Sequence, residues 1–228
     1  AELLMPDVLQ WCAQQPQRSQ LTALCSSLKN WNRRADLDSG IGLVHFQNIL
    51  QSLLKRNDIW RIAFDPADPQ HTPRGLAVER AEVAQALKDA ALASMEAVRT
   101  AGLADDVRWG QIQQAVDGTP IHGGPASLGV YNAIQSVPTA PGKRLVVSGT
   151  SYLQLVTFDG KGPQAQGLLA FSESSEAQSQ HASDQTRAFS AKRWHVIPFT
   201  EAQIKADPQY RTQVVREVNS AQVANTTP

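Results

Sequence analysis

Apolar side chains recur at helical spacing through the first hundred residues. Residues 43–55 place apolar side chains three and four positions apart, at Phe46, Ile49, Leu50, Leu53 and Leu54. This spacing brings them onto one face of an amphipathic helix. Asp38 and Ser39 stand just before this helix and are candidates for capping its first turn.

A longer helical pattern covers residues 76–98. One face of that helix collects small and medium side chains, at Ala84, Leu87, Ala91, Met95 and Val98. Alanine lets another backbone approach closely, so we expect tight packing on this face instead of a wide pocket. Residues 3–12 also have a helical pattern. Residues 64–75 contain three prolines, which break helices, and therefore predict a loop or linker.

The second half of the chain changes character. Residues 103–143 are rich in Gly and Pro without a sustained period, which predicts a long loop of the kind that binds a ligand or lines a site. Residues 145–158 carry apolar side chains on both faces and predict a strand buried between layers. Asp159-Gly160 then predicts a hairpin turn, and residues 164–172 the returning strand.

The last segments predict a helix and a strand. Ser183 can cap a helix over residues 184–193, residues 210–218 have a strand pattern, and the tail after Asn219 is polar. Helices first and strands later favour an α+β protein, or a layered fold completed by strands outside this chain. We therefore divide the chain into a mainly helical lobe at 1–102, a loop region at 103–144 and a strand-rich part at 145–228.

Composition excludes some classes of partner. Among 228 residues, Lys and Arg number 21 and Asp and Glu number 21, so no net charge favours nucleic acid or an anionic membrane. No apolar run has membrane-spanning length, and the chain has no signal peptide at its start. The first residue, Ala1, indicates processing, nicking or a trimmed sample.

Stand-alone catalytic motifs are missing from the sequence. It contains no His-Glu-x-x-His, no Gly-x-Ser-x-Gly and no phosphate-binding loop. Gly149-Thr150-Ser151 resembles half of a nucleophile elbow, but we expect its hydroxyls to pack within a strand. The histidines have no metal-ligand spacing, and we expect neither a metal nor a cofactor; they are His45, His71, His122, His181 and His195.

Two stretches could imitate a site. Ser179, His181 and Asp184 are the residue types of a hydrolytic triad, but triad members usually come from separate elements, so we expect them to bond their own loop. Asp36 and Asp38 lack the oxygen spacing of a calcium-binding loop.

A third stretch combines a tryptophan with paired glycines. Trp109 offers a large apolar surface, and the glycines of the His122-Gly123-Gly124 sequence let a backbone approach closely. The residues alone allow either an acyl-binding wall or a tight turn packed under a tryptophan. Cys12 and Cys25 likewise allow a disulfide or two buried thiols.

Three sequence features occur in the order found in a known family. Leu-x-x-Trp at 28–31 precedes Ala-Asp-Leu-Asp-Ser at 35–39, and Trp-Gly at 109–110 precedes His-Gly-Gly at 122–124. Gly-Thr-Ser-Tyr at 149–152 leads into Ser-x-His-x-x-Asp-Gln at 179–185. This order resembles the penicillin amidase family, in its branch of acyl-homoserine lactone and lipopeptide acylases. Asn32, Gln178 and Gln180 depart from the family's usual residues.

The resemblance implies an N-terminal-nucleophile hydrolase with a layered αββα fold. In that family a precursor cuts itself into a small and a large chain, and the new N-terminal serine attacks an amide. This chain resembles the C-terminal part of the large chain, with no catalytic residue of its own. Trp109, His122, Gly123 and Gly124 would then line part of the substrate pocket.

The resemblance also implies partners and a location. The partners are the small alpha chain, the N-terminal part of the large chain and an N-acyl small molecule, without nucleic acid or a membrane span. Export to the periplasm or medium is expected, with a disulfide between Cys12 and Cys25.

The residues and the resemblance together leave three functional hypotheses. The first is hydrolysis of N-acyl-homoserine lactones (quorum quenching), with lipopeptides and β-lactams such as penicillins as further substrates. The second is a non-catalytic extracytoplasmic binding or scaffold protein derived from this lobe. The third, a serine esterase using Ser179 and His181, is disfavoured by their spacing.

Overall fold

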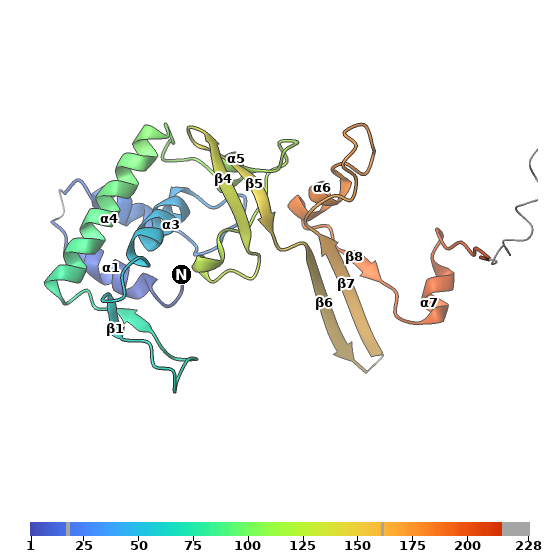
Figure 1. Cartoon of the computed structure of the whole chain (residues 1–228), viewed down its shortest axis with the longest axis horizontal. Helices are drawn as coiled ribbons and strands as arrows, with labels where there is room; N and C mark the ends of the chain where they lie inside the picture. The colour runs from blue at the N-terminus through green and yellow to red at the C-terminus, as the bar shows by residue number, and fades with distance from the viewer. Residues whose placement is uncertain (17–18, 161, 216–228) are drawn as a thin grey trace, which may run out of the picture. The chain divides into compact units, whose positions relative to one another are not determined.

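The structure is a computed structural model that describes residues 1–16, 19–160 and 162–215. Its contacts divide the chain into two compact units. The first unit contains residues Ala1–Leu153 and Leu168–Arg193, and the second contains Gln154–Gly167 with the chain from Trp194 onward. Figure 1 shows both units along the chain.

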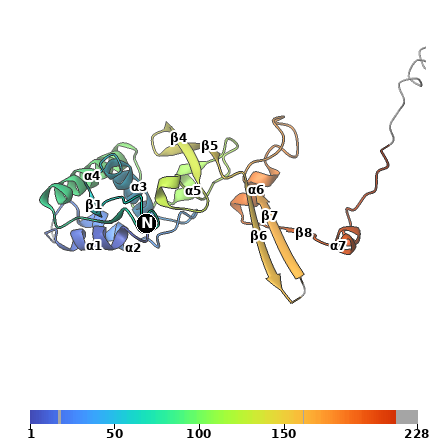
Figure 2. The same cartoon turned by 60° about the horizontal axis from the view of Figure 1, so that its bottom comes forward.

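Helices α1 (Met5–Ala13), α2 (Thr22–Asn30), α3 (Ile41–Leu53) and α4 (Ala81–Thr100) form the helical part of the first unit. They share one core, and α3 and α4 lie side by side in both views (Figures 1 and 2). The largest fully buried core side chains on α1 to α3 are Met5, Trp11, Leu24, Leu28, Leu43, Phe46, Ile49 and Leu53. The three predicted helices are confirmed, with shifted ends.

Two details of the helical predictions are wrong. Leu54 is an exposed C-cap of α3, because the helix ends at Leu53. The long helix begins at Ala81 and not at 76, because Leu76 pairs in a short hairpin of β1 (Trp60–Ile62) and β2 (Arg74–Leu76). The residues between these strands are the predicted loop.

The hairpin of β1 and β2 is fastened to α1 by one carboxylate. Asp7 Oδ2 accepts a hydrogen bond from the Leu76 amide at 2.9 Å, and Oδ1 accepts one from Arg61 Nη2 at 3.0 Å. A buried carboxylate is stable only with such partners, so Asp7 couples the first helix to the hairpin.

The predicted loop region at 103–144 contains regular structure. It holds α5 (Trp109–Ile112), β3 (Gln113–Gln114), the 3₁₀ turn η1 (Ala126–Leu128) and β4 (Ile134–Ala140), followed by β5 (Lys143–Gly149). The strand order β3-β5-β4 makes β4 an edge strand. An edge strand tolerates Pro138, since one side of its backbone needs no ladder hydrogen bond.

The predicted strand at 145–158 is two strands. β5 ends at Gly149, and β6 (Tyr152–Asp159) belongs to another sheet. Gly149 has a φ of +151°, and a Cβ there would lie 2.4 Å from the Ala133 carbonyl oxygen. Only glycine permits this close approach. The hydroxyls of Thr150 and Ser151 therefore lie in a break between strands and not within a strand.

In the sheet β6-β7-β8, with β7 (Gly162–Leu169) and β8 (His195–Ile197), strand β6 is exposed on both faces within the described residues, whereas Leu168 near the end of β7 is buried. Phe158 is 81% exposed and Leu155, which points to the opposite face, is 54% exposed. The predicted hairpin is confirmed. The sequence pattern predicts that the first strand of this hairpin is buried between layers. In this chain taken alone, β6 is exposed.

The remaining C-terminal predictions have mixed outcomes. α6 (Asp184–Ser190) confirms the predicted helix, although the Ser183 side chain caps no backbone amide. β8 and α7 (Glu201–Ala206) were not expected from the sequence pattern. Residues 210–215 form no strand, so this part of the predicted strand at 210–218 is wrong. Residues 216–218 and the tail after Asn219 lie outside the described residues.

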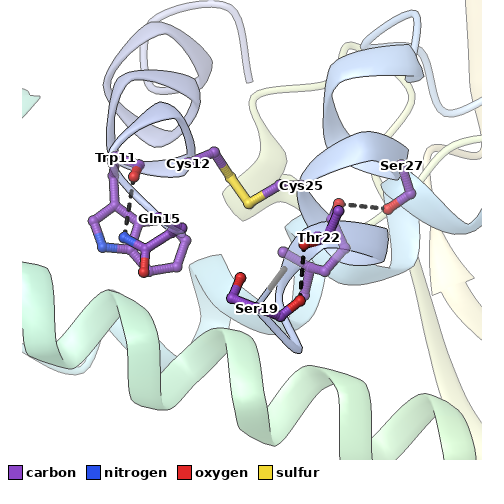
Figure 3. The surroundings of a disulfide bond; sticks show 8 residues. Trp11, Cys12, Gln15, Ser19, Thr22, Cys25 and Ser27 are labelled. Carbon is purple, nitrogen blue, oxygen red and sulfur yellow. Dashed lines mark hydrogen bonds between the residues drawn. A yellow bond between two sulfur atoms is a disulfide. The ribbon is translucent and has the colours of Figure 1, made fainter. Parts of the chain in front are cut away.

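Cys12 and Cys25 form a disulfide that joins α1 to α2 (Figure 3). Their Cα atoms are 5.7 Å apart, and their positions in the sequence differ by 13. In the described part of the chain no helix is long and apolar enough to cross a membrane.

Candidate functional site

Trp109 is held in place by hydrogen bonds within the chain. Its backbone amide donates to the Ser39 carbonyl at 2.8 Å, and the Gly110 amide donates to Leu37 at 2.9 Å. These bonds satisfy the first amides of α5, which no turn of its own helix can reach. The indole is 1% exposed and its Nε1 donates to the Gly123 carbonyl at 2.8 Å.

Gly123 is the centre of this hydrogen-bond cluster. Its carbonyl accepts from Trp109 Nε1 and from Gln113 Nε2 at 3.1 Å, and its amide donates to Ala35 at 2.7 Å. Its φ is +96°, and a Cβ there would lie 2.6 Å from two atoms of Asn132. Both the backbone angle and the crowding therefore require glycine.

His122 joins this loop to α6. Its Nε2 lies 3.0 Å from the Phe189 carbonyl, its Nδ1 lies 3.0 Å from Asn132 Nδ2, and its ring stacks on Phe189. A carbonyl only accepts and an amide nitrogen only donates, so the proton is on Nε2 and Nδ1 accepts. Burial lowers the pKa of His122, while the Phe189 carbonyl opposes that shift. The His122 ring is therefore neutral and connects this loop to α6.

The four residues predicted to line a substrate pocket do come together, but in the interior. Trp109 and His122 are buried, and their polar atoms are used by Gly123, Asn132 and Phe189. Two cavities in the described part of the chain, one beside α2 to α4 and one around residues 101–107 and 141–143, are lined by none of the four. In this structure they form the tight turn under a tryptophan, and a role as a pocket wall stays a prediction for a larger assembly.

The Ser179, His181 and Asp184 group is a self-bonded loop. His181 Nδ1 lies 2.7 Å from Asp184 Oδ2, and the hydroxyl of Ser179 accepts from the His181 backbone amide at 3.1 Å. His181 Nε2 contacts the side chain of Gln180. In the residues that the structure describes, no hydrogen bond joins the Ser179 hydroxyl to the imidazole, so the nucleophile and base of a triad are not paired.

Acidic residues are used for structural contacts. Asp36 pairs with Lys192 Nζ at 2.6 Å, which holds the end of α6 near the segment before α3. The described ranges contain no group of three or more His, Cys, Asp or Glu side chains that could hold a metal ion.

A buried histidine that sequence reasoning left unassigned lies at a cavity. His45 on α3 is 6% exposed, and its Nδ1 lies 2.9 Å from the Ser94 hydroxyl on α4. Burial lowers the pKa of His45 from 6.5 to about 4, with Asp105 opposing. The sequence signal was weak because Ser94 is 49 positions away.

Comparison with known proteins identifies the family. The family model described as penicillin amidase matches residues 1–206. The chain belongs to the penicillin amidase family.

Curated members of this family are similar along almost the whole chain. An acyl-homoserine lactone acylase, PvdQ, from Pseudomonas putida is 61% identical over 225 residues, covering 99% of this chain and 29% of that protein. The protein of the same name from Pseudomonas fluorescens Pf0-1 is 59% identical, covering 95% and 28%. Aculeacin-A acylase from Actinoplanes utahensis is 33% identical, also covering 95% and 28%.

The chain thus spans less than a third of the length of these relatives. Among solved structures, a thermostable penicillin G acylase from Alcaligenes faecalis matches with a TM-score of 0.44 and 14% identity, covering 94% of this chain and 46% of that one. That likeness is too distant to support an argument about fold or function.

Replacing Gly123 tests whether the buried cluster holds the first unit together. Gly118 provides a control, because its φ is +82° but nothing lies within 4 Å of an added Cβ. Gly118→Ala should cost about 1 kcal/mol through backbone strain alone. Gly123→Ala should cost about 3 kcal/mol or more, because it adds a clash with Asn132. Denaturant titration measures both, and equal losses would contradict the account.

The pH dependence of stability tests the burial of His45. The unfolded chain binds a proton near pH 6.5, whereas the folded chain resists protonation down to about pH 4. The free energy of unfolding should therefore fall by about 3 kcal/mol from this residue as pH drops through that window. In His45→Gln, which keeps an acceptor for Ser94, this part of the slope should vanish. An unchanged slope would show that His45 is not buried as a neutral ring.

Proposed function

We propose that this chain is the C-terminal part of the large chain of an acylase that hydrolyses N-acyl-homoserine lactones at their amide bond. The observation that carries the proposal is 61% identity over 99% of the chain to a relative named acyl-homoserine lactone acylase. The relative is more than three times as long, which leaves room for a catalytic part outside these residues.

The chemistry of amide hydrolysis needs an activated nucleophile, a base and donors for the oxyanion. Within the described ranges, Ser179 accepts from a backbone amide, and the Ser94 hydroxyl is buried between His45 and Asn48. Neither hydroxyl is placed to attack a substrate. The proposal therefore assigns the nucleophile to the N-terminal serine of the large chain, whose own amino group acts as base.

The role of this chain is then structural support around that serine. Strand β6 has apolar side chains on both faces, the pattern of a strand covered by other layers. We assign β6 and β7 to the inner sheets of a layered αββα fold, covered by the upstream part of the large chain and by the small chain. This covering also accounts for side chains such as Phe158, which would otherwise be an aggregation hazard.

Further substrates and the location follow from the relatives and from the disulfide. The 33% identity to aculeacin-A acylase supports activity on lipopeptides, and the family name supports activity on β-lactams. A disulfide between Cys12 and Cys25 persists in an oxidising compartment, which supports a periplasmic or secreted protein. Cleavage of acyl-homoserine lactones there would remove quorum signals.

The test compares the complete processed protein with the 228-residue chain alone, using an N-acyl-homoserine lactone with a long saturated acyl chain. We expect the complete protein to release homoserine lactone and fatty acid, and the chain alone to release neither. Ser179→Ala in the complete protein should keep full activity, whereas alanine in place of the large chain's first serine should abolish it.

Two outcomes would contradict the proposal. If the complete protein cleaves no N-acyl amide, this lobe serves a binding or scaffold protein. If the Ser179→Ala variant is inactive while still folded, the nucleophile belongs to this chain.

A further inference from the structure

A cavity of about 1050 Å³ opens between α2 and α4, across the start of α3. Its volume is of the order of small-molecule sites in other proteins. All of its lining residues belong to the first unit. It is lined by none of Trp109, Gln113, His122 and Gly123, so it is a separate feature of the fold.

The first turn of α3 lines this cavity and has unused backbone donors. Gly40, Ile41 and Gly42 line it, and no acceptor among the described residues bonds their amides. The predicted capping side chains do not bond the first amides of α3. Ser39 Oγ instead donates to the Arg34 carbonyl at 2.7 Å and accepts from the Asp36 amide at 3.0 Å. Capping by Asp38 and Ser39 is therefore a wrong prediction, because the hydroxyl is used within its own turn.

His45, one turn further along α3, adds a side-chain donor. Its Nδ1 lies 2.9 Å from the Ser94 hydroxyl, which accepts from Asn48 Nδ2 at 3.2 Å. Nδ1 is the one acceptor that this buried hydroxyl reaches among the described residues, so the hydroxyl donates its proton to His45. The proton of the neutral ring is therefore on Nε2. No described residue bonds that nitrogen, and His45 is one of the residues that line the cavity.

The charges around the cavity select the kind of ligand. Two guanidinium groups and three carboxylates line it, from Arg99, Arg108, Asp38, Glu96 and Asp105, which leaves one carboxylate in excess. Arg99 is already paired with Glu96. A ligand anion thus gains no net attraction, while a cation would face the amides of a helix N-terminus and an N–H group. A neutral hydrogen-bond acceptor is not repelled by the excess carboxylate, and it can accept from the amides and the N–H group.

The opposite part of the cavity is apolar. Leu92, Met95 and Val98 come from successive turns of α4, and Leu103 follows from the next loop. These side chains are partly buried and line the cavity. The prediction of tight packing without a pocket on this face of α4 is therefore wrong at Met95 and Val98. A hydrocarbon chain laid along them would leave water while its polar end stays at α3.

We propose that this cavity binds a small neutral carbonyl compound with an apolar chain, the carbonyl oxygen accepting from the α3 amides and His45 Nε2. Arg108, whose Nη1 donates to the Asp38 carbonyl at 3.2 Å beside Gly40, borders the polar end. The site is independent of the proposed amide hydrolysis, and failure of either leaves the other standing.

The experiment titrates the complete protein, labelled with ¹³C in its histidines, with 2-octanone as a neutral probe that cannot be hydrolysed. The Cε1–H resonance of His45 is assigned by its loss in His45→Phe. We expect this resonance to shift saturably with 2-octanone. Octanoate and octylammonium, which have the same chain length but opposite charges, should shift it more weakly.

A matched pair at Gly40 tests the role of the helix N-terminus. An added Cβ there meets only Arg108 Nη1 at 3.6 Å, so the Cβ of either variant fits. Gly40→Asn supplies an internal cap that occupies the free amides; it should preserve or raise the melting temperature and weaken 2-octanone binding about fivefold or more. Gly40→Ala adds the Cβ without an acceptor and should bind like the parent.

Three results would overturn the proposal. The His45 resonance stays unmoved up to the solubility limit of 2-octanone, as it would if another segment of the protein filled the cavity. Alternatively, Gly40→Asn binds as tightly as Gly40→Ala, or one of the charged probes binds more tightly than the ketone.

Discussion

The first unit depends on the backbone of Gly123. Its carbonyl receives donors from Trp109 and Gln113, and its amide bonds Ala35 in the segment between α2 and α3. Buried polar groups are costly when unpaired, so these three bonds must form together for the strands to pack on the helices. His122, the preceding residue, extends the same cluster to α6 through Phe189.

This constraint explains why residues that look functional in sequence act structurally here. A tryptophan, a histidine and two glycines are typical of a ligand-binding loop. In the folded chain the indole nitrogen and the imidazole Nε2 donate to backbone carbonyls, the imidazole Nδ1 accepts from Asn132 Nδ2, and the glycines allow the close approach. The cavity lies elsewhere, at the uncapped start of α3. Its donors come from the backbone and from His45, neither of which carries a motif.

The sequence predicted what depends on local spacing. The stripe from Phe46 to Leu53 determines α3 because helical periodicity and burial agree there, and the turn at Asp159-Gly160 determines its hairpin. The disulfide followed from the family resemblance. The elements within 103–144 could not be predicted, because β3 is stabilised by pairing with Arg144 and Leu145 about thirty residues later. The break at Gly149 depends on its contact with Ala133, and the cavity donor at His45 depends on Ser94. Such long-range contacts leave no periodic signal.

The central claim is that the reactive hydroxyl of the complete protein lies outside these 228 residues, which form the body around it. The most direct measurement is to treat the complete, active protein with a serine-directed sulfonyl fluoride and to map the modified peptide by mass spectrometry. The account predicts that inactivation follows modification of the N-terminal serine of the large chain, with every serine of this chain unmodified. Stoichiometric modification of a serine within this chain, in step with loss of activity, would contradict it.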